Sequence, residues 1–203
     1  MLVNILSEMI SYVINRKDRP ERWDAVSAEF QRVGLKPTRF DAVITTPGWC
    51  GCRDSHIQAM RLGMETGDGC FGVFEDDVKF LTDPREFLVE AIWQLPTGWD
   101  ALFLGASPQE PFQRVSRSLF RMGKAFCTHA IIWNTRPGGA VDYILEHEGE
   151  IKKIDQYFSE QIYPNFRCYL ASPLVATQIQ YQSDTCGRSD VTTIVTNFLK
   201  YCI

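Results

Sequence analysis

The stretch Cys70-Phe71-Gly72-Val73-Phe74-Glu75-Asp76-Asp77-Val78 decides the fold class. Its first half is a mostly apolar run bounded by Gly69 and by three consecutive acids, a pattern typical of a buried strand. The acids then emerge at the edge of the sheet, and open α/β sheets usually bind ligands outside the carboxyl ends of their strands. The stretch therefore predicts an α/β sheet with a ligand site at one edge.

The three adjacent carboxylates predict a cation at that edge. They repel one another, and burial of even one unpaired carboxylate is costly. A hard divalent cation with oxygen ligands, Mn²⁺ or Mg²⁺, fits best. Because side chains alternate along a strand, we expect Glu75 and Asp77 on one face and Asp76 on the other. The alternative is a solvated acidic turn before Lys79 and Phe80.

Length and composition are those of an ordinary globular protein. The 203 residues are within the range of one large domain, so we expect a single domain over residues 1–203. The hydrophobic fraction of 45% and the charged fraction of 23% are sufficient for a core without disulfide staples. The formal net charge of −4 argues against a nucleic-acid partner, which would require a basic face.

The cysteines and the apolar segments bear on location. The seven cysteines are odd in number and scattered, which indicates reduced thiols and a cytoplasmic protein. We find no run that approaches the ~18 apolar residues of a membrane span. No Lys or Arg precedes Arg16, so the start lacks the basic region of a signal peptide. Peripheral association with a membrane stays open.

Apolar periodicity predicts alternating strands and helices. We expect strands at residues 9–15, 39–44, 70–78, 100–105, 116–122 and 125–134, and within 169–181, where Pro173 interrupts the last one. Helices are expected at 21–33, 55–65, 84–94, 138–148, 154–160 and 191–201, although a β-branched run disfavours the last. Residues 45–52 and 106–114 read as loops. The resulting fold class is α/β, with a mixed sheet that is parallel in its first half, antiparallel later and flanked by helices.

Five segments match one family pattern, in the same order. They are residues 13–23 (Val-Ile-Asn-Arg-Lys-Asp-Arg-Pro-Glu-Arg-Trp), 48–56 (Gly-Trp-Cys-Gly-Cys-Arg-Asp-Ser-His), 73–78 (Val-Phe-Glu-Asp-Asp-Val), 99–105 (Trp-Asp-Ala-Leu-Phe-Leu-Gly) and 154–155 (Ile-Asp). Over residues 9–184 the chain thereby resembles glycosyltransferase family 25, the lipooligosaccharide and collagen galactosyltransferase group. The resemblance implies a GT-A-like fold, a UDP-sugar donor (UDP-galactose in the best-known members), Mn²⁺ and inversion at the anomeric carbon.

The resemblance also assigns roles to the acids. Asp77 matches the third residue of the family's Glu-Asp-Asp motif, the metal ligand, while Glu75 would support the metal or hold the ribose. Asp76 is counted with the donor-binding residues. The chemistry agrees, because negative charge grows on the phosphate oxygens of a departing nucleoside diphosphate. A cation held by two carboxylates stabilises that charge.

Residues after the first strand are expected to bind the donor. Arg16, Arg19 and Arg22 can meet phosphate or the uracil edge, since guanidinium geometry suits both. Surface charge at a helix start is the alternative interpretation. Asn15, at the end of the strand, is expected to contact the nucleoside.

Ser55 and His56 follow a glycine-containing loop and are expected to begin a helix, whose N-terminus favours the pyrophosphate. An N-cap serine and a half-buried histidine are the alternatives. Cys50 and Cys52 with His56 form a partial zinc pattern. The family has a cysteine in the matching loop, which favours a structural thiol instead.

An inverting transfer requires a base that takes the proton of the acceptor hydroxyl. Asp155 is our candidate, and a helix-capping role is its alternative. Asp100, at a strand start, is the rival base. His129 and Asp184 are further contacts for the metal or the diphosphate. Among the tryptophans, Trp49 lies in an expected loop and is the candidate for stacking on a sugar.

Three functions remain in competition. The first is a metal-dependent glycosyltransferase whose acceptor is a glycan, as in lipopolysaccharide biosynthesis, or a protein hydroxyl. The second is a non-catalytic sugar-nucleotide or glycan-binding module with the same fold. The third is a metal-dependent phosphotransferase or nucleotidyltransferase that uses the same acids. The chain is shorter than many members of the family, which leaves the acceptor open, because loops usually set acceptor specificity.

Overall fold

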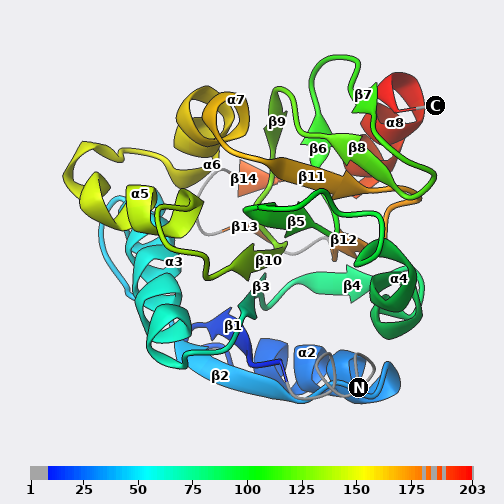
Figure 1. Ribbon diagram of the computed structural model, residues 1–203. Helices are drawn as coiled ribbons and strands as arrows, with labels where there is room; N and C mark the ends of the chain where they lie inside the picture. The colour runs from blue at the N-terminus through cyan, green and yellow to red at the C-terminus, as the bar shows by residue number, and fades with distance from the viewer. Residues whose placement is uncertain (1–8, 180–181, 184–186, 189–190, 203) are drawn as a thin grey trace.

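The structure, a computed structural model, describes residues 9–179, 182–183, 187–188 and 191–202. Within this part of the chain, eight strands form a central sheet in the order β2-β1-β3-β10-β5-β11-β8-β7 (Figure 1). The strands of this sheet are β1 (Ser11–Asn15), β2 (Pro37–Asp41), β3 (Cys70–Glu75), β5 (Ala101–Phe103), β7 (Gln113–Arg114), β8 (Leu119–Arg121), β10 (Ala130–Asn134) and β11 (Cys168–Ala171). Three small two-stranded sheets pair β4 (Val78–Phe80) with β12 (Ala176–Gln178), β6 (Ser107–Pro108) with β9 (Ala125–Phe126), and β13 (Gln182–Ser183) with β14 (Gly187–Arg188).

The predicted mixed sheet is confirmed. β1 runs parallel to both β2 and β3, which are the first strands of the chain. β10 then lies antiparallel between β3 and β5, and β8 is antiparallel to β11. β11 is parallel to β5, so the later half is not purely antiparallel.

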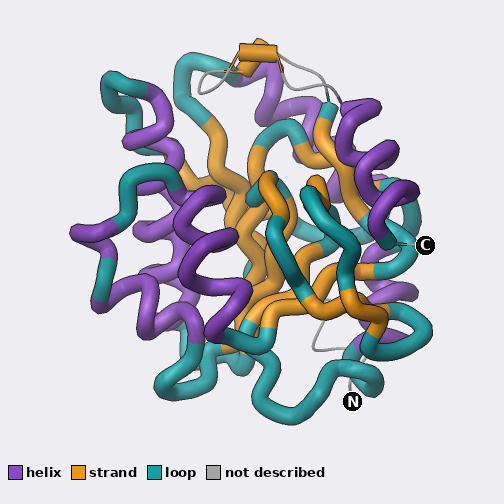
Figure 2. Tube along the Cα trace, turned by 90° about the horizontal axis from the view of Figure 1, so that it is seen from above, coloured by secondary structure: helices purple, strands orange, loops and turns teal. Residues whose placement is uncertain are grey.

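Helices cover both faces of the sheet (Figure 2). They are α2 (Pro20–Arg32), α3 (Gly48–Glu65), α4 (Pro84–Ala91), α5 (Ala140–Glu146) and α8 (Val191–Tyr201), with a 3₁₀ turn η1 (Glu148–Glu150). A further helical run consists of α6 (Ile154–Tyr157), a π-helical segment η2 (Phe158–Ile162) and α7 (Tyr163–Asn165). In the described part of the chain, no helix combines the length and apolarity needed to cross a membrane.

Alternation along the buried strands produces two apolar layers. In β3, Phe71 and Val73 point into a layer with residues of α3, α5, α6, η2 and α8. Phe74 points into the other layer, which α2 and α4 cover. There it packs edge-on against Phe30 of α2, with ring centroids 5.1 Å apart. The central strands are therefore buried on both faces, which explains their near-continuous apolar sequence.

The first helix begins and ends at the predicted signals. Pro20 occupies the first turn of α2, where its missing N–H costs nothing. At the other end Gly34 adopts φ 66°, and Leu35 N donates to Phe30 O at 2.9 Å. This is a Schellman-type end, which favours glycine because other residues rarely adopt positive φ. The short connection that follows brings β2 beside β1.

The second predicted helix begins earlier than expected. We placed its start at Ser55 after a loop over residues 45–52, but α3 starts at Gly48, directly after Pro47 in extended conformation. The loop after β2 packs so closely on this helix that a Cβ on Gly51 would collide with Val43 O. Ser55 and His56 therefore lie inside α3, and the expectation that they form its N-terminus is wrong.

The acidic stretch also differs from the prediction. β3 ends at Glu75, and Asp76 and Asp77 form a turn before β4, which belongs to a different sheet. β3 loses its neighbour there, because its register with β1 pairs Glu75 with Ile14 and goes no further. Strict alternation through residue 77 is therefore wrong, and the three side chains are free to point toward one cleft.

Smaller differences concern strand boundaries. The second strand ends at Asp41 rather than at residue 44, which frees residues 42–45 as a loop. The strand expected over 125–134 is divided into β9 and β10, because Cys127 has φ 78° and breaks the extended run. The loop expected over 106–114 contains β6 and β7. Residues 191–201 form α8 despite their β-branched run.

Candidate active site

A cleft of about 680 Å³ lies at the carboxyl ends of β1 and β3. We call it the acid-lined cleft. Its walls come from the ends of these strands, the loop 42–45, the first turns of α3, the segment 124–128, the start of α6 and the end of β12. Eight of the predicted site residues line it: Arg16, Arg22, Ser55, His56, Glu75, Asp76, Asp77 and Asp155. The fold thus brings segments from the whole length of the chain to one place.

Glu75 is held by two side chains from opposite walls. Thr128 Oγ1 donates to Glu75 Oε1 at 2.7 Å, and His56 Nε2 lies 3.3 Å from the same oxygen. Burial by itself raises the pKa of Glu75, but the contacts with His56 and Thr128 outweigh it and hold the pKa below its ordinary value. Glu75 is therefore a carboxylate, and no described residue bonds to its second oxygen, Oε2.

Asp76 is bound by two of the residues that were predicted to contact the sugar-nucleotide donor. Asn15 Nδ2 donates to Asp76 Oδ2 at 2.7 Å, and Arg22 NH1 lies 3.5 Å from Oδ1. Burial raises the pKa of Asp76, and these two contacts only partly offset it. Both oxygens of Asp76 are thus occupied by protein groups.

Asp77 is the least compensated of the three acids. Gln178 Nε2 donates to its Oδ2 at 3.1 Å, whereas Oδ1 is buried and accepts no hydrogen bond from any residue that the structure describes. Burial raises the pKa of Asp77 well above its ordinary value, and the charges of Glu75 and Asp76 raise it further. A buried carboxylate oxygen without a partner is costly and calls for a positive ligand.

The oxygens left over suit a divalent cation that is shared with a substrate. Glu75 Oε2 and Asp77 Oδ1 are two hard oxygen ligands, the type that Mn²⁺ and Mg²⁺ prefer. The described residues hold no group of three or more His, Cys, Asp or Glu side chains that would bind a metal alone. Mg²⁺-type sites use one or two carboxylates and complete their shell with waters and substrate phosphates.

The alternative zinc pattern is not supported by the geometry. Cys50 and Cys52 lie two residues apart in α3, so their side chains leave the helix about 200° apart. Tetrahedral zinc requires converging ligands. The two thiols and His56 therefore do not form a zinc site.

The other predicted donor-side residues have distinct positions. Arg16 lines the cleft and pairs with Asp18 at 2.7 Å. Asn15 is buried behind the wall, where its Nδ2 contacts both Asp76 and the backbone oxygen of Arg19 at 3.2 Å. Arg19 stands at the N-terminal end of α2 and is not among the residues that line the cleft. Asn15 thus positions an acid rather than facing the cleft itself.

Ser55 and His56 act on neighbouring protein groups. Ser55 Oγ donates to Gly51 O at 2.6 Å and accepts a bond from Val43 N at 2.9 Å, which fastens the loop 42–45 onto α3. The side chain of His56 is buried against Glu75. The helix N-terminus that faces the cleft belongs to Gly48 and Trp49 instead, and Trp49 lines the cleft beside the exposed side chain of Ile44.

Asp155 lines the cleft from the start of α6. Lys153 rather than Asp155 is the N-cap of α6, and Asp155 Oδ1 accepts one bond, from Gln156 N at 2.8 Å. Cys127 lines the same cleft, and burial raises its pKa to about 12, with smaller contributions from the charges of Glu75, Asp77 and Asp155. Asp155 and the acid triplet therefore border one cleft.

Asp100, the rival base, lies at the other edge of the sheet. Strand register aligns Ala101 with Trp133 and Trp133 with Phe71, so Asp100 is level with the start of β3, roughly 16 Å from Glu75 along the strand. Its oxygens bind Arg136 at 2.7 Å and the backbone N–H groups of residues 140 and 167. Asp100 is a structural acid, and its assignment as a rival base is wrong.

Of two further predicted contacts, His129 does not reach the cleft and Asp184 cannot be placed. His129 is fully buried behind Glu75, and burial lowers its pKa to about 4, so it is a neutral imidazole. It is not among the residues that line the cleft. Asp184 lies outside the described residues.

The sequence did not reveal four residues that the fold adds to the cleft. Thr128 and Gln178 bind the acids, and Lys124 and Lys153 bring positive charge to the side of Asp155. Lys124, Thr128 and Gln178 are distant from the acid triplet in sequence and carry no motif, and Lys153 precedes the matched segment 154–155 without belonging to it. The positive φ of Cys127, which turns this segment into the cleft, has no sequence signal because cysteine rarely adopts it.

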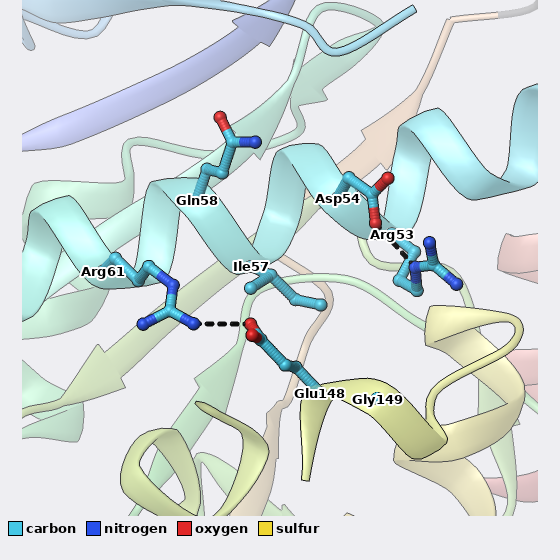
Figure 3. A pocket seen from close by; sticks show the side chains of 7 residues that line it. All are labelled: Arg53, Asp54, Ile57, Gln58, Arg61, Glu148 and Gly149. Atoms are coloured by element: carbon cyan, nitrogen blue, oxygen red, sulfur yellow. Dashed lines mark hydrogen bonds and ion pairs between the residues drawn. The ribbon is translucent and has the colours of Figure 1, made fainter. Parts of the chain in front are cut away.

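A second cleft, of about 480 Å³, lies between α3 and η1 (Figure 3). Arg61 pairs there with Glu148 at 2.6 Å, and Arg53 pairs with Asp54 at 2.7 Å and donates to Ile151 O at 2.9 Å. The charges of this cleft are thus already matched by one another. The acid-lined cleft is the better candidate for a reaction site.

A scan against protein-family models and a search of curated proteins find no match. Among solved structures, a glycosyltransferase involved in the glycosylation of the major capsid of PBCV-1 matches with a TM-score of 0.56 at 8% identity, over 94% of this chain and 99% of that chain. A197 from STIV matches with a TM-score of 0.47 at 13% identity, over 84% and 85% of the two chains. Mannose-1-phosphate geranyltransferase from Thermus thermophilus matches with a TM-score of 0.44 at 12% identity, over 84% and 62%. The likeness concerns the fold, which is GT-A-like as predicted, whereas membership of family 25 stays a prediction.

Proposed function

We propose that this chain is a metal-dependent, inverting glycosyltransferase that moves a sugar, galactose by the family resemblance, from UDP to a hydroxyl of a glycan or a protein. The observation that carries the proposal is the pair of carboxylate oxygens, Glu75 Oε2 and Asp77 Oδ1, in a cleft at the carboxyl edge of a GT-A-like sheet. One of them is buried without a partner. Two such oxygens suit a cation that also binds a diphosphate.

Glu75 and Asp77 would hold Mn²⁺ or Mg²⁺, and the bound ion would supply positive charge to the phosphate oxygens of the leaving UDP. Arg16 and Arg22, on the same side of the cleft, would bind and orient the nucleotide. The apolar wall of residues 42–45 with Trp49 would shield the donor from water. The lysines at 124 and 153 would add positive charge on the acceptor side.

Asp155 would act as the base. It would accept the proton of the acceptor hydroxyl while that oxygen forms a bond to the anomeric carbon and the bond from this carbon to the diphosphate oxygen breaks. Attack from the face opposite UDP inverts the anomeric carbon, so an α-linked donor gives a β-linked product. Asp155 and the arginines line the same cleft from different segments of the chain, which supports this division into a donor side and an acceptor side.

Incubation with a panel of UDP-sugars that includes UDP-galactose, with Mn²⁺ or with EDTA, tests the proposal. We expect Mn²⁺-dependent release of UDP, faster with a glycan acceptor than with water. Tight binding without release would favour the binding module, and release of inorganic pyrophosphate or transfer of phosphate would favour the nucleotidyl- or phosphotransferase. Absence of both binding and release would refute the proposal.

The stereochemistry of the product provides an independent check. The coupling constant of its anomeric proton in NMR distinguishes a β from an α linkage, and an α product would exclude a single inverting step. The free thiols at positions 50, 70, 127, 168 and 202 support a reducing compartment, so we propose that the reaction takes place in the cytoplasm.

A further inference from the structure

Each acid of the triplet is held by an uncharged side chain from a different segment. Asn15 binds Asp76 at 2.7 Å, Thr128 binds Glu75 at 2.7 Å and Gln178 binds Asp77 at 3.1 Å. Among the described residues, only Asp76 of the three also pairs with an arginine, at 3.5 Å from Arg22. Within the described part of the chain, the contacts that fix Glu75 and Asp77 thus include no ion pair with an arginine or a lysine.

Gln178 is placed beside Asp77 by a dedicated pair of strands. β12 lies antiparallel to β4, with Gln178 opposite Val78, the residue after Asp77. Ile179 N also donates to the backbone oxygen of Asp77 at 2.6 Å. The backbone and the side chain of one short segment therefore both fix Asp77.

Gln178 contacts only one of the two carboxylate oxygens of Asp77. Gln178 occupies Oδ2, while Oδ1 is buried and has no hydrogen-bond partner among the described residues. A neutral amide satisfies one lone pair but leaves the full negative charge for an incoming cation. The buried Glu29 shows the opposite solution, because Arg32 and Lys79 bind it at 2.7 and 3.0 Å and neutralise it.

We infer that Gln178 is a positioning residue for the divalent cation: it orients Asp77 so that Oδ1 faces the ion, and it preserves the charge that binds the ion. The inference rests on the proposed function, since it requires a cation at Glu75 and Asp77. It assigns to the end of β12 a role that neither the acidic motif nor the fold comparison indicates. Groups that orient metal ligands typically contribute roughly 10- to 100-fold to metal affinity.

Two substitutions test the inference, with Mn²⁺ affinity measured by electron paramagnetic resonance in the presence of UDP. Gln178→Met keeps the length but removes the amide, and we expect Mn²⁺ to bind roughly 10- to 100-fold more weakly. Gln178→Lys places an ammonium beside Asp77. It should weaken Mn²⁺ at least as much, because the ammonium neutralises the acid, and it should raise the thermal midpoint of the metal-free protein.

Gln94→Met is the matched control. Gln94 Nε2 also contacts a carboxylate, Glu90 Oε1 at 3.3 Å, but it lies outside the residues that line the acid-lined cleft. We expect this variant to keep the wild-type affinity for Mn²⁺. Equal losses in the Gln94 and Gln178 variants would point to a general loss of structure and overturn the inference.

The outcomes separate this inference from the proposed function. If the wild type binds no Mn²⁺ in the presence of UDP, the metal-dependent function fails and the inference fails with it. If the wild type binds Mn²⁺ and both Gln178 variants bind it equally well, the inference alone is refuted. The lysine variant retains a donor for Asp77 Oδ2, so it keeps the test decisive if the methionine variant does not fold.

Discussion

The amino and carboxyl ends of the central strands, which we call the amino and carboxyl edges, place buried aspartates in opposite environments. At the amino edge of β5, Asp100 is buried and binds Arg136 and two backbone N–H groups. At the carboxyl edge of β3, the described residues give Asp77 one neutral donor and leave its other, buried oxygen without a partner. Both acids follow or precede an apolar strand, yet only the first is fully satisfied.

The difference distinguishes structural acids from functional ones. An acid whose bonds are complete adds to the stability of the fold, whereas an acid kept short of partners weakens the fold until a ligand arrives. Glu29 belongs with Asp100: burial alone raises its pKa, but bonds from Arg32, Lys79 and Phe80 N lower it to about 2. Asp77, whose pKa is raised, belongs with the functional acids.

The largest expected effect comes from the substitution of Asp77, at the carboxyl edge. Asp77→Ala removes one of the two free carboxylate oxygens, so Mn²⁺-dependent binding of UDP should be lost while the fold persists. Calorimetric titration of UDP with and without Mn²⁺ measures this. An unchanged dependence on Mn²⁺ would show that Asp77 is not the metal ligand.

The next effect concerns the base on the far side of the same cleft. Asp155→Asn keeps the shape and the bond from Gln156 N but removes the proton acceptor, so transfer should fall by roughly two to four orders of magnitude. Affinity for UDP and Mn²⁺ should barely change, because the group acts on the acceptor. Steady-state rates of transfer provide the measurement, and near-normal transfer would reduce Asp155 to a residue that stabilises the start of α6.

Substitution of Asp100, at the amino edge, should lower the stability of the protein rather than its activity. Asp100→Ala leaves the partly exposed Arg136 and two backbone N–H groups without their acceptor, and each buried donor left unsatisfied costs about 1–3 kcal/mol. Chemical denaturation should show this loss. Well below the melting temperature, the folded variant should bind UDP with unchanged Mn²⁺ dependence, and loss of that dependence would contradict the division between the two edges.

The smallest expected effect tests whether the buried charge of Asp77 destabilises the metal-free protein. The folded-state pKa of Asp77 lies above its unfolded value, so its stabilising share is present below about pH 4 and is lost as the pH rises through the folded-state pKa. In metal-free buffer at pH 7, Asp77→Asn should therefore stabilise the protein, because it removes a charge whose burial is unfavourable. The gain should vanish near pH 3. Thermal midpoints measured at both pH values decide this, and destabilisation at pH 7 would place Asp77 with the satisfied acids.

Local sequence predicted the elements because their signals are short-range. The apolar run 70–74, the Pro20 and Gly34 boundaries of α2 and the strand-helix-strand order are each encoded within a few residues. The same reasoning placed Glu75, Asp76 and Asp77 at the edge of the sheet, where the structure has them. Whether they bind metal and donor stays a prediction.

The partners of these acids depend on contacts that no local pattern contains. Thr128 meets Glu75 because Cys127 turns its segment into the cleft, and Gln178 meets Asp77 because β12 pairs with β4. Alternation along the strand failed at Asp76 because β3 has no neighbour beyond Glu75. Sequence alone thus established which acids end the strand, and tertiary packing decided which of their oxygens are satisfied, because hydrogen-bond partners come from segments that only the folded chain brings together.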